Sequence, residues 1–159
     1  MRHASDRRRV IWGGILAGLG IGGFFDGIVL HQILQWHHLL SDVYPVTTVA
    51  GLERNTLGDG LFHAASYLLK VAGLFLLWSA ARGRHTAWPA GLLLGTLLLG
   101  WGLFNLLEGT VNHYFLRIHH VRPGPNENFY DLSFLAWGAL MFGGGGVLLR
   151  RALLGLPDA

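Results

Sequence analysis

The 159-residue sequence contains no cysteine, and this absence excludes several kinds of chemistry. Disulfide scaffolds, iron–sulfur clusters, thiolate metal sites and cysteine nucleophiles all need that residue. Charge is also scarce, because Asp, Glu, Lys and Arg make up 13% of the chain, where soluble domains carry roughly 25%. Hydrophobic residues make up 52%, which excludes disorder and exceeds what a soluble domain of this size can bury. The composition predicts an integral membrane protein.

The charge that is present sits at the ends of apolar segments. The net charge of +3 comes from 12 basic and 9 acidic residues, too small and too scattered for a nucleic-acid partner. The bilayer is the expected partner instead. Eight arginines flank one side of the apolar segments and three flank the other, which predicts that both termini lie in the cytoplasm. The eight are Arg2, Arg7, Arg8, Arg9, Arg82, Arg84, Arg150 and Arg151, and the three are Arg54, Arg117 and Arg122.

Four apolar segments are long enough to cross a membrane. They cover about residues 10–36, 60–81, 87–116 and 132–149. A helix rises about 1.5 Å per residue, so about 20 residues cross a hydrocarbon core of about 30 Å. The first segment is too long for a signal peptide and has no plausible cleavage site, so we expect it to be retained. The predicted fold class is all-α, an integral membrane four-helix bundle forming a single domain over residues 1–159.

Close helix packing is predicted from the glycine content. The chain has 24 glycines, and many are spaced as small-xxx-small, as in Gly14, Gly18 and Gly22 or in Gly91 and Gly95. Helices in lipid gain little from the hydrophobic effect, so close approach of their backbones supplies much of the association energy.

An internal repeat carries the polar residues of the spans. Residues 26–38 and 108–120 both read acid, glycine, three residues, histidine, five residues and two histidines, at a constant offset of 82. The chain therefore looks like two tandem helical hairpins related by a pseudo-two-fold axis along the membrane normal. The second helices match less well. DGLFH (59–63) corresponds to DLSFL (131–135), so we expect an asymmetric site.

The motif residues are expected to meet near the outer membrane face. The first and third helices run outward, which places Asp26 and Glu108 past the midplane and His31 and His113 near the hydrocarbon edge. The second and fourth helices bring Asp59, His63 and Asp131 in at the same level. An ionised acid inside the bilayer costs about 2.5–3.5 kcal/mol, so these acids need a compensating partner.

A transition metal is the partner that we favour. Imidazole and carboxylate suit zinc, iron, copper or manganese, and helix bundles build such sites from facing side chains. We expect His31, His63 and His113 to be the core ligands, one from each of three helices. The acids would ligate the metal or fix the imidazole tautomers. The predicted metal ligands are His31, His63, His113, Asp26, Glu108, His38 and His120.

Continued α-helical geometry would place the paired histidines on two faces. At 100° per residue Asp26 and His37 share one helix face, and His31 and His38 share another. All four paired histidines, His37, His38, His119 and His120, are candidate ligands, and the predicted set includes His38 and His120. The alternative is that these pairs lie at the membrane interface, which histidine and tryptophan favour.

Several runs resemble one family. They are GFFDGIVLHQILQWHH (23–38), DGLFH (59–63), GWGLFNLLEG (100–109) and HHVR (119–122). They resemble a bacterial membrane family catalogued as domain of unknown function 2243, over about residues 10–150. The resemblance implies a small four-span protein of the bacterial inner membrane and supplies no activity.

Three functions fit these residues. The first is a membrane metalloprotein: an oxidoreductase, a hydrolase of a lipid or small molecule, or a metal-delivery factor. In hydrolysis the metal would activate water, with Asp59 or Glu108 as the catalytic base. The second is a haem cytochrome with His31 and His113 as axial ligands. The third is a metal-free proton-coupled transporter or assembly subunit in which acids and histidines relay protons; four short spans would then require a homo-oligomer or a partner protein. The alternative to all three is that the carboxylate–histidine pairs and Lys70 only neutralise one another within the bundle.

Overall fold

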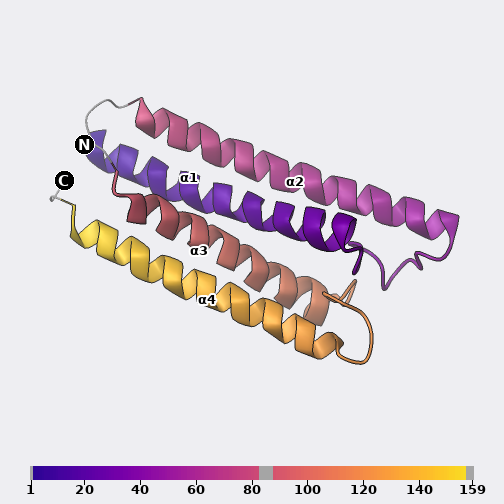
Figure 1. The fold of residues 1–159 in the computed structure, drawn as a ribbon. Coiled ribbons are helices and arrows are strands. Elements are labelled where there is room, and N and C mark those ends of the chain that lie inside the picture. Colours follow the sequence, from indigo (N-terminus) through magenta and orange to yellow (C-terminus); the bar gives the residue numbers. More distant parts are fainter. Residues whose placement is uncertain (1, 83–87, 157–159) are drawn as a thin grey trace.

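The computed structural model describes residues 2–82 and 88–156, and within those residues it contains helices and no strand. Four of its helical segments are long and apolar enough to cross a membrane: Ser5–Ile33, Val49–Ala81, Ala90–Phe115 and Glu127–Leu154. The elements in chain order are α1 (Arg2–Phe25), the π-helix η1 (Asp26–Ile33), α2 (Val49–Ala81), α3 (Ala90–Glu108), the π-helix η2 (Gly109–Phe115) and α4 (Glu127–Leu154) (Figure 1). The predicted all-α, four-span fold class is confirmed.

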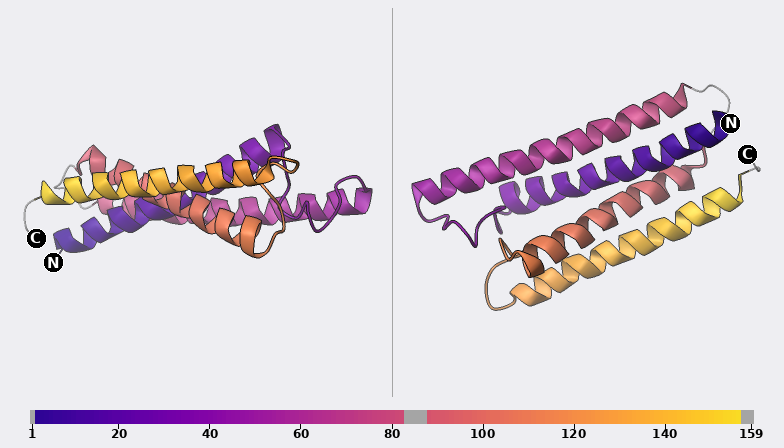
Figure 2. Two further views of the ribbon diagram at one scale, coloured as in Figure 1. Left: turned by 90° about the horizontal axis from the view of Figure 1, so that it is seen from below. Right: turned by 180° about the vertical axis from the view of Figure 1, so that it is seen from behind.

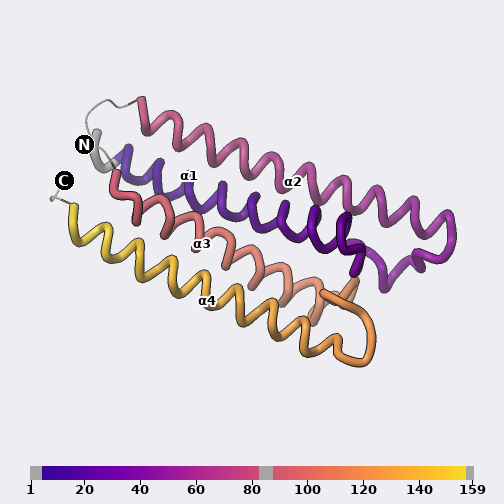
Figure 3. Tube along the Cα trace, viewed as in Figure 1, coloured from indigo at the N-terminus to yellow at the C-terminus, as the bar shows by residue number. Residues whose placement is uncertain are grey.

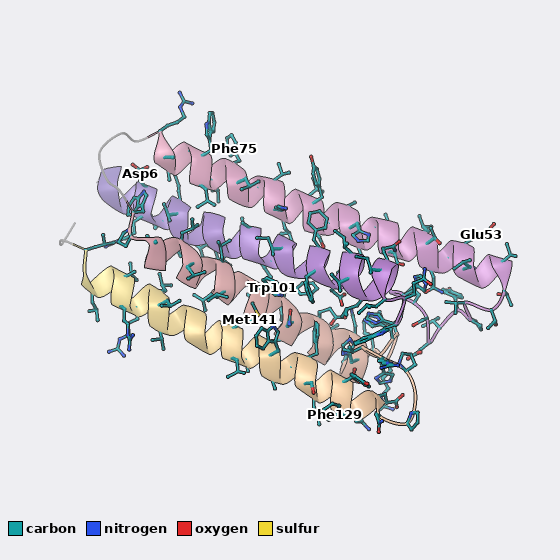
Figure 4. All side chains as sticks on the ribbon, viewed as in Figure 1. Asp6, Glu53, Phe75, Trp101, Phe129 and Met141 are labelled. Carbon is teal, nitrogen blue, oxygen red and sulfur yellow. The ribbon has the colours of Figure 1, made fainter. Side chains whose placement is uncertain are left out.

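The helices lie side by side in the order α2, α1, α3, α4, so the bundle is opened into one twisted layer (Figures 1 and 2). Within the described residues, α2 makes no close backbone contact with α3 or α4, and α1 makes none with α4. Large apolar side chains project from the layer. Phe75 of α2 and Phe129 of α4 are 61% and 68% exposed and point away from the other helices (Figure 4). Such surfaces suit lipid.

Glycines at seven-residue intervals line the contacts between antiparallel neighbours. A Cβ atom on Gly13 of α1 would lie 3.0 Å from the carbonyl oxygen of Gly73 in α2. In the second pair, a Cβ atom on Gly95 of α3 would lie 2.9 Å from the carbonyl oxygen of Gly145 in α4. Only glycine permits backbones to approach this closely. The series continues at Gly20 and Gly27 in the first half and at Gly102 and Gly109 in the second.

The predicted small-residue stripe of α1 forms a different contact. Gly14, Gly18 and Gly22 face α3, and a Cβ atom on Gly18 would lie 3.0 Å from the Cα of Gly100. The predicted close packing through these glycines is therefore confirmed. Gly91 does not form such a close contact. A Cβ atom on Gly91 would lie 3.8 Å from the Cβ of Ala152, an ordinary van der Waals distance.

Helix boundaries differ from the prediction where helices extend beyond the apolar segments. α2 begins at Val49 instead of about residue 60, because Thr48 caps it: its Oγ1 accepts a hydrogen bond from the Gly51 N–H at 3.1 Å. Hydropathy marks only the lipid-embedded part of a helix, so it does not predict the polar first turns of α2. α4 likewise covers Glu127–Leu154 instead of 132–149. α3 begins at Ala90, and residues 83–87 lie outside the described part of the chain.

The first span ends earlier than predicted, at Ile33 instead of Trp36. The Leu34 N–H donates to the Val29 carbonyl at 2.8 Å, and Gln35 then takes a left-handed conformation with φ 49°. That conformation stops a right-handed helix. The paired histidines therefore lie in a loop, and the prediction that they continue α-helical faces is wrong.

The third span ends in the same way, at Phe115 instead of Leu116. The Leu116 N–H donates to the Val111 carbonyl at 2.7 Å, and Arg117 has φ 50°. The two ends of the described chain lie together at the opposite end of the layer from these loops (Figure 3). This agrees with the prediction that both termini lie on one side of the membrane. That this side is the cytoplasm stays a prediction.

Candidate metal centre

The two π-helices bring each acid onto the histidine five residues later. Asp26 Oδ2 lies 3.2 Å from His31 Nε2, and Glu108 Oε2 lies 3.3 Å from His113 Nε2. In an α-helix, residues five apart are about 140° apart around the axis. A π-helix bonds residue i to residue i+5, so one turn carries the chain from the acid to its histidine. The acid–histidine spacing of the repeat matches this wider turn.

The loops that follow the π-helices interlock at the centre. His37 donates from Nδ1 to the Val121 carbonyl at 2.8 Å, and His119 donates from Nδ1 to the Leu39 carbonyl at 2.9 Å. The two imidazole rings stack, with centroids 4.6 Å apart and planes 7° from parallel. In each half, a backbone carbonyl therefore accepts a hydrogen bond from a histidine of the other half.

Asp59 of α2 organises the first half. Its Oδ1 accepts from His31 Nδ1 at 2.8 Å, and its Oδ2 accepts from His38 Nδ1 at 2.6 Å. The Leu39 N–H and the Gln32 side-chain amide also donate to this carboxylate, at 2.9 and 3.3 Å.

Asp131 of α4 has the same position in the second half. Its Oδ1 lies 3.2 Å from His113 Nδ1 and accepts from the Val121 N–H at 2.9 Å. Its Oδ2 accepts from His120 Nδ1 at 2.6 Å. The contacts of Asp59 and Asp131 thus correspond in the two halves, which departs from the expected asymmetry because His63, the unmatched residue, belongs to neither convergent donor group. The origin of the halves by duplication stays a prediction.

Imidazole nitrogens and carboxylate oxygens converge between the halves. One group of donor atoms within 4.8 Å of one another comes from His31, His37 and His119, and a second comes from Glu108, His113 and His119. These side chains are between 0% and 7% exposed. A carbonyl oxygen can only accept, so His37 and His119 must carry hydrogen on Nδ1. In the neutral form the inward Nε2 of each then has a free lone pair.

Charge at the centre is not balanced by lysine or arginine. Asp26, Asp59, Glu108 and Asp131 are all buried, and among the described residues their ion-pair partners are imidazoles alone. Lys70 Nζ lies over the Phe24 ring, 5.1 Å from its centroid. Compensation can therefore come from imidazolium, from a bound cation or from protonation of a carboxylate.

The two central loop histidines have opposite protonation tendencies. Burial lowers the pKa of His37 to about 2, and the neighbouring His119 and His31 add to the shift, so His37 stays neutral. Burial also opposes protonation of His119, but its hydrogen bond to Glu108 at 2.8 Å, the charges of Glu108 and Asp26 and the hydrogen bond to Leu39 together raise the His119 pKa. The raised pKa favours the imidazolium form of His119 beside Glu108.

A family profile described as "Predicted membrane protein (DUF2243)" matches residues 13–152. The chain belongs to this family. The resemblance found in the sequence motifs is thereby confirmed, together with the membrane location of the protein. The match includes every residue of the centre in this DUF2243 protein. No curated protein and no solved structure matches the chain.

The DUF2243 chain brings together some of the predicted ligands and separates others. His31, His113 and Glu108 belong to the convergent groups, and Asp26 contacts His31. His63 does not reach them. Its Nε2 is buried against Gly27, without a hydrogen bond, and its ring lies 6.2 Å from that of Phe24.

His38 and His120 lie on the outer side of the supporting acids. His38 Nδ1 contacts Asp59 and His120 Nδ1 contacts Asp131, and the two histidine side chains are 19% and 18% exposed. They belong to neither convergent group. Asp59 already accepts hydrogen bonds on both oxygens, so its contacts suit a positioning group better than the predicted catalytic base.

Sequence reasoning left three central residues out of the ligand and support set. His37 and His119, the first members of the pairs, point inward in place of the second members. Asp131 supports His113 as Asp59 supports His31. The correspondence between Asp59 and Asp131 was visible in the sequence and could have identified this acid.

Proposed function

We propose that this protein is a metalloprotein of the bacterial inner membrane whose centre binds a transition metal through inward imidazole nitrogens and carboxylate oxygens. One observation carries the proposal. Among the described residues, eight buried side-chain polar atoms have no hydrogen-bond partner, and five of them belong to this cluster. Four of the five lie 3.2–3.3 Å from an imidazole nitrogen or a carboxylate oxygen without forming a hydrogen bond. Buried polar atoms are almost always hydrogen-bonded, so this concentration supports a further partner such as a metal ion. The five are Asp26 Oδ2, His31 Nε2, His37 Nε2, Glu108 Oε2 and His113 Nδ1.

The surroundings of the imidazoles support metal ligation. A metal-bound histidine usually donates its other ring N–H to a carboxylate or carbonyl, which fixes the tautomer and the ring orientation. His31 donates to Asp59, and His37 and His119 donate to backbone carbonyls. A donor set of imidazole and carboxylate without thiolate suits zinc, iron, copper or manganese.

The geometry favours electron transfer or redox chemistry on a small molecule over hydrolysis of a bulky lipid. The side chains at the centre are nearly or fully buried, so a large substrate has no direct approach to them. Glu108 belongs to a convergent donor group, which suits a ligand better than a free base. Iron and copper are the metals that would support such redox chemistry.

The arrangement disfavours haem between His31 and His113. The stacked rings of His37 and His119 occupy the space that a porphyrin would need. The His37 ring is centred 4.5 Å from that of His31, and the His119 ring is centred 4.9 Å from that of His113.

Metal analysis of the purified protein tests the proposal. The chain would be purified in mild detergent without added metal, and its metal content measured by mass spectrometry. We expect at least one transition-metal ion per chain, and its loss in the double variant His31→Ala/His113→Ala. The matched control is His63→Leu, because the second half carries Leu135 at the corresponding position, and this variant should keep the full content. Metal-free wild-type protein that also fails to bind added metal would overturn the proposal and favour the proton relay. Unchanged content in a folded double variant would overturn it too.

A further inference from the structure

Each half of the centre supplies a complete set of three donors. In the first half, Asp26 lies 3.2 Å from His31 and 3.9 Å from His37. In the second half, Glu108 lies 3.3 Å from His113 and 2.8 Å from His119. The same unit therefore recurs in both halves. It consists of a carboxylate, the histidine five residues later in the π-helix, and the first histidine of the loop that follows.

We propose that the centre is dinuclear and holds two divalent ions, one on each unit. This inference rests on the proposed function, since it concerns the same donors. The first ion is bound by Asp26, His31 and His37, and the second by Glu108, His113 and His119.

The distribution of donors supports two ions over one. Two groups of three donor atoms lie within 4.8 Å, one formed by His31, His37 and His119 and the other by Glu108, His113 and His119. Asp26 joins the first group through its contacts with His31 and His37, at 3.2 and 3.9 Å. His119 belongs to both groups, so the ion positions are adjacent. A single ion would leave part of the buried donor set without a partner, which is unfavourable for buried polar groups.

Charge balance also favours two divalent ions over one. The two ligating carboxylates and the two supporting carboxylates, Asp59 and Asp131, are between 0% and 7% exposed. With neutral imidazoles and ionised acids, these four groups carry a charge of −4. Two divalent ions neutralise that charge, whereas one would leave −2 in a medium of low dielectric constant, where uncompensated charge is unfavourable.

Stoichiometry of the metal-stripped protein distinguishes the two cases. The full chain in detergent would be titrated with Cu²⁺, with bound ion measured after removal of free ion. We expect two ions per wild-type chain and one per chain in each of the single variants His31→Ala and His113→Ala. The control His63→Leu should still bind two.

Electron paramagnetic resonance supplies a second measurement that a misfolded variant cannot imitate. Two adjacent Cu²⁺ ions couple, so the wild-type signal should account for less than the two spins bound, whereas each single variant should give the full signal of one uncoupled ion. Wild-type protein that saturates at one ion would overturn the dinuclear centre and leave the metalloprotein intact. Failure to bind any ion would overturn both. Two uncoupled ions that persist in both single variants would place the metal elsewhere and also overturn the inference.

Discussion

Each central histidine has two ring nitrogens with different surroundings, and this difference determines what the side chain can do. The outer nitrogen of His37 faces the Val121 carbonyl, and that of His31 faces Asp59, both at 2.8 Å. A neutral imidazole carries one N–H, so fixing it on the outer nitrogen leaves a lone pair on the inner one. In the proposed centre, Asp59 and Asp131 are therefore positioning residues that would act on a metal through the imidazoles.

Replacement of the supporting acid Asp59 should weaken metal binding without removing a ligand. Asp59→Asn replaces a charged acceptor with an amide that accepts only on one side, so His31 loses its fixed tautomer. Loss of such a partner typically lowers metal affinity by about 10–100-fold. We expect a decrease in this range in competition titrations with a chelator. The control is Asp42→Asn, because Asp42 lies 3.8 Å from His120 and its side chain is 33% exposed. Equal affinities of the two variants would contradict the supporting role of Asp59.

Sequence reasoning identified the chemical types at the centre better than the individual residues. Asp26, His31, Glu108 and His113 were predicted from an acid and a histidine recurring at one spacing. The sequence did not single out the inward histidines, His37 and His119, from their neighbours His38 and His120, because the prediction assumed that the α-helices continue. The left-handed turn at Gln35 invalidates that assumption, and glutamine gives no local signal for such a turn.

Helix contacts in the layer depend on glycines whose neighbours are backbone atoms. A Cβ atom on Gly100 of α3 would lie 2.9 Å from the Leu19 nitrogen of α1. Backbone cannot rotate away as a side chain can, so a larger residue must force the two helices apart. The sequence predicted this close packing from glycine spacing. The sequence did not predict that the four helices form a single layer, because the lipid-facing sides of α2 and α4 are as apolar as a buried interface.

Substitution of Gly100 should therefore destabilise the fold more than substitution of a glycine on a free face. Gly100→Leu overpacks the α1–α3 contact, which costs about 1–3 kcal/mol in typical cores. The matched control is Gly144→Leu in α4, where a Cβ atom would meet nothing within 4 Å. In that control the better helix propensity of leucine contributes less than about 1 kcal/mol of stabilisation. Thermal unfolding in detergent should show a lower midpoint for Gly100→Leu alone. Similar midpoints for both variants would contradict the close α1–α3 contact.

At the scale of the whole molecule, the centre joins two hairpins whose long helices, within the described residues, make close backbone contact through α1 and α3. Each outer loop crosses to the other half, where His37 bonds Val121 and His119 bonds Leu39. A metal bound there would tie the loops together at one end of the layer, while the chain ends lie at the other end (Figure 3). The side of the membrane that the centre faces therefore depends on the side on which the termini lie.

Arginine distribution predicts that the termini are cytoplasmic and the centre lies toward the exterior, and reporter fusions can measure this. Short loops rich in arginine stay in the cytoplasm, and the segments near the chain ends and between α2 and α3 hold eight of the eleven arginines, against three in the outer loops. Green fluorescent protein fused after residue 159 should fluoresce, and alkaline phosphatase fused there should be inactive. Phosphatase inserted after Gly124, an exposed glycine with φ 126°, should be active in the periplasm. The reversed pattern of reporter activities would place the centre at the cytoplasmic face, where the reducing compartment would supply the electrons or metal that reach it.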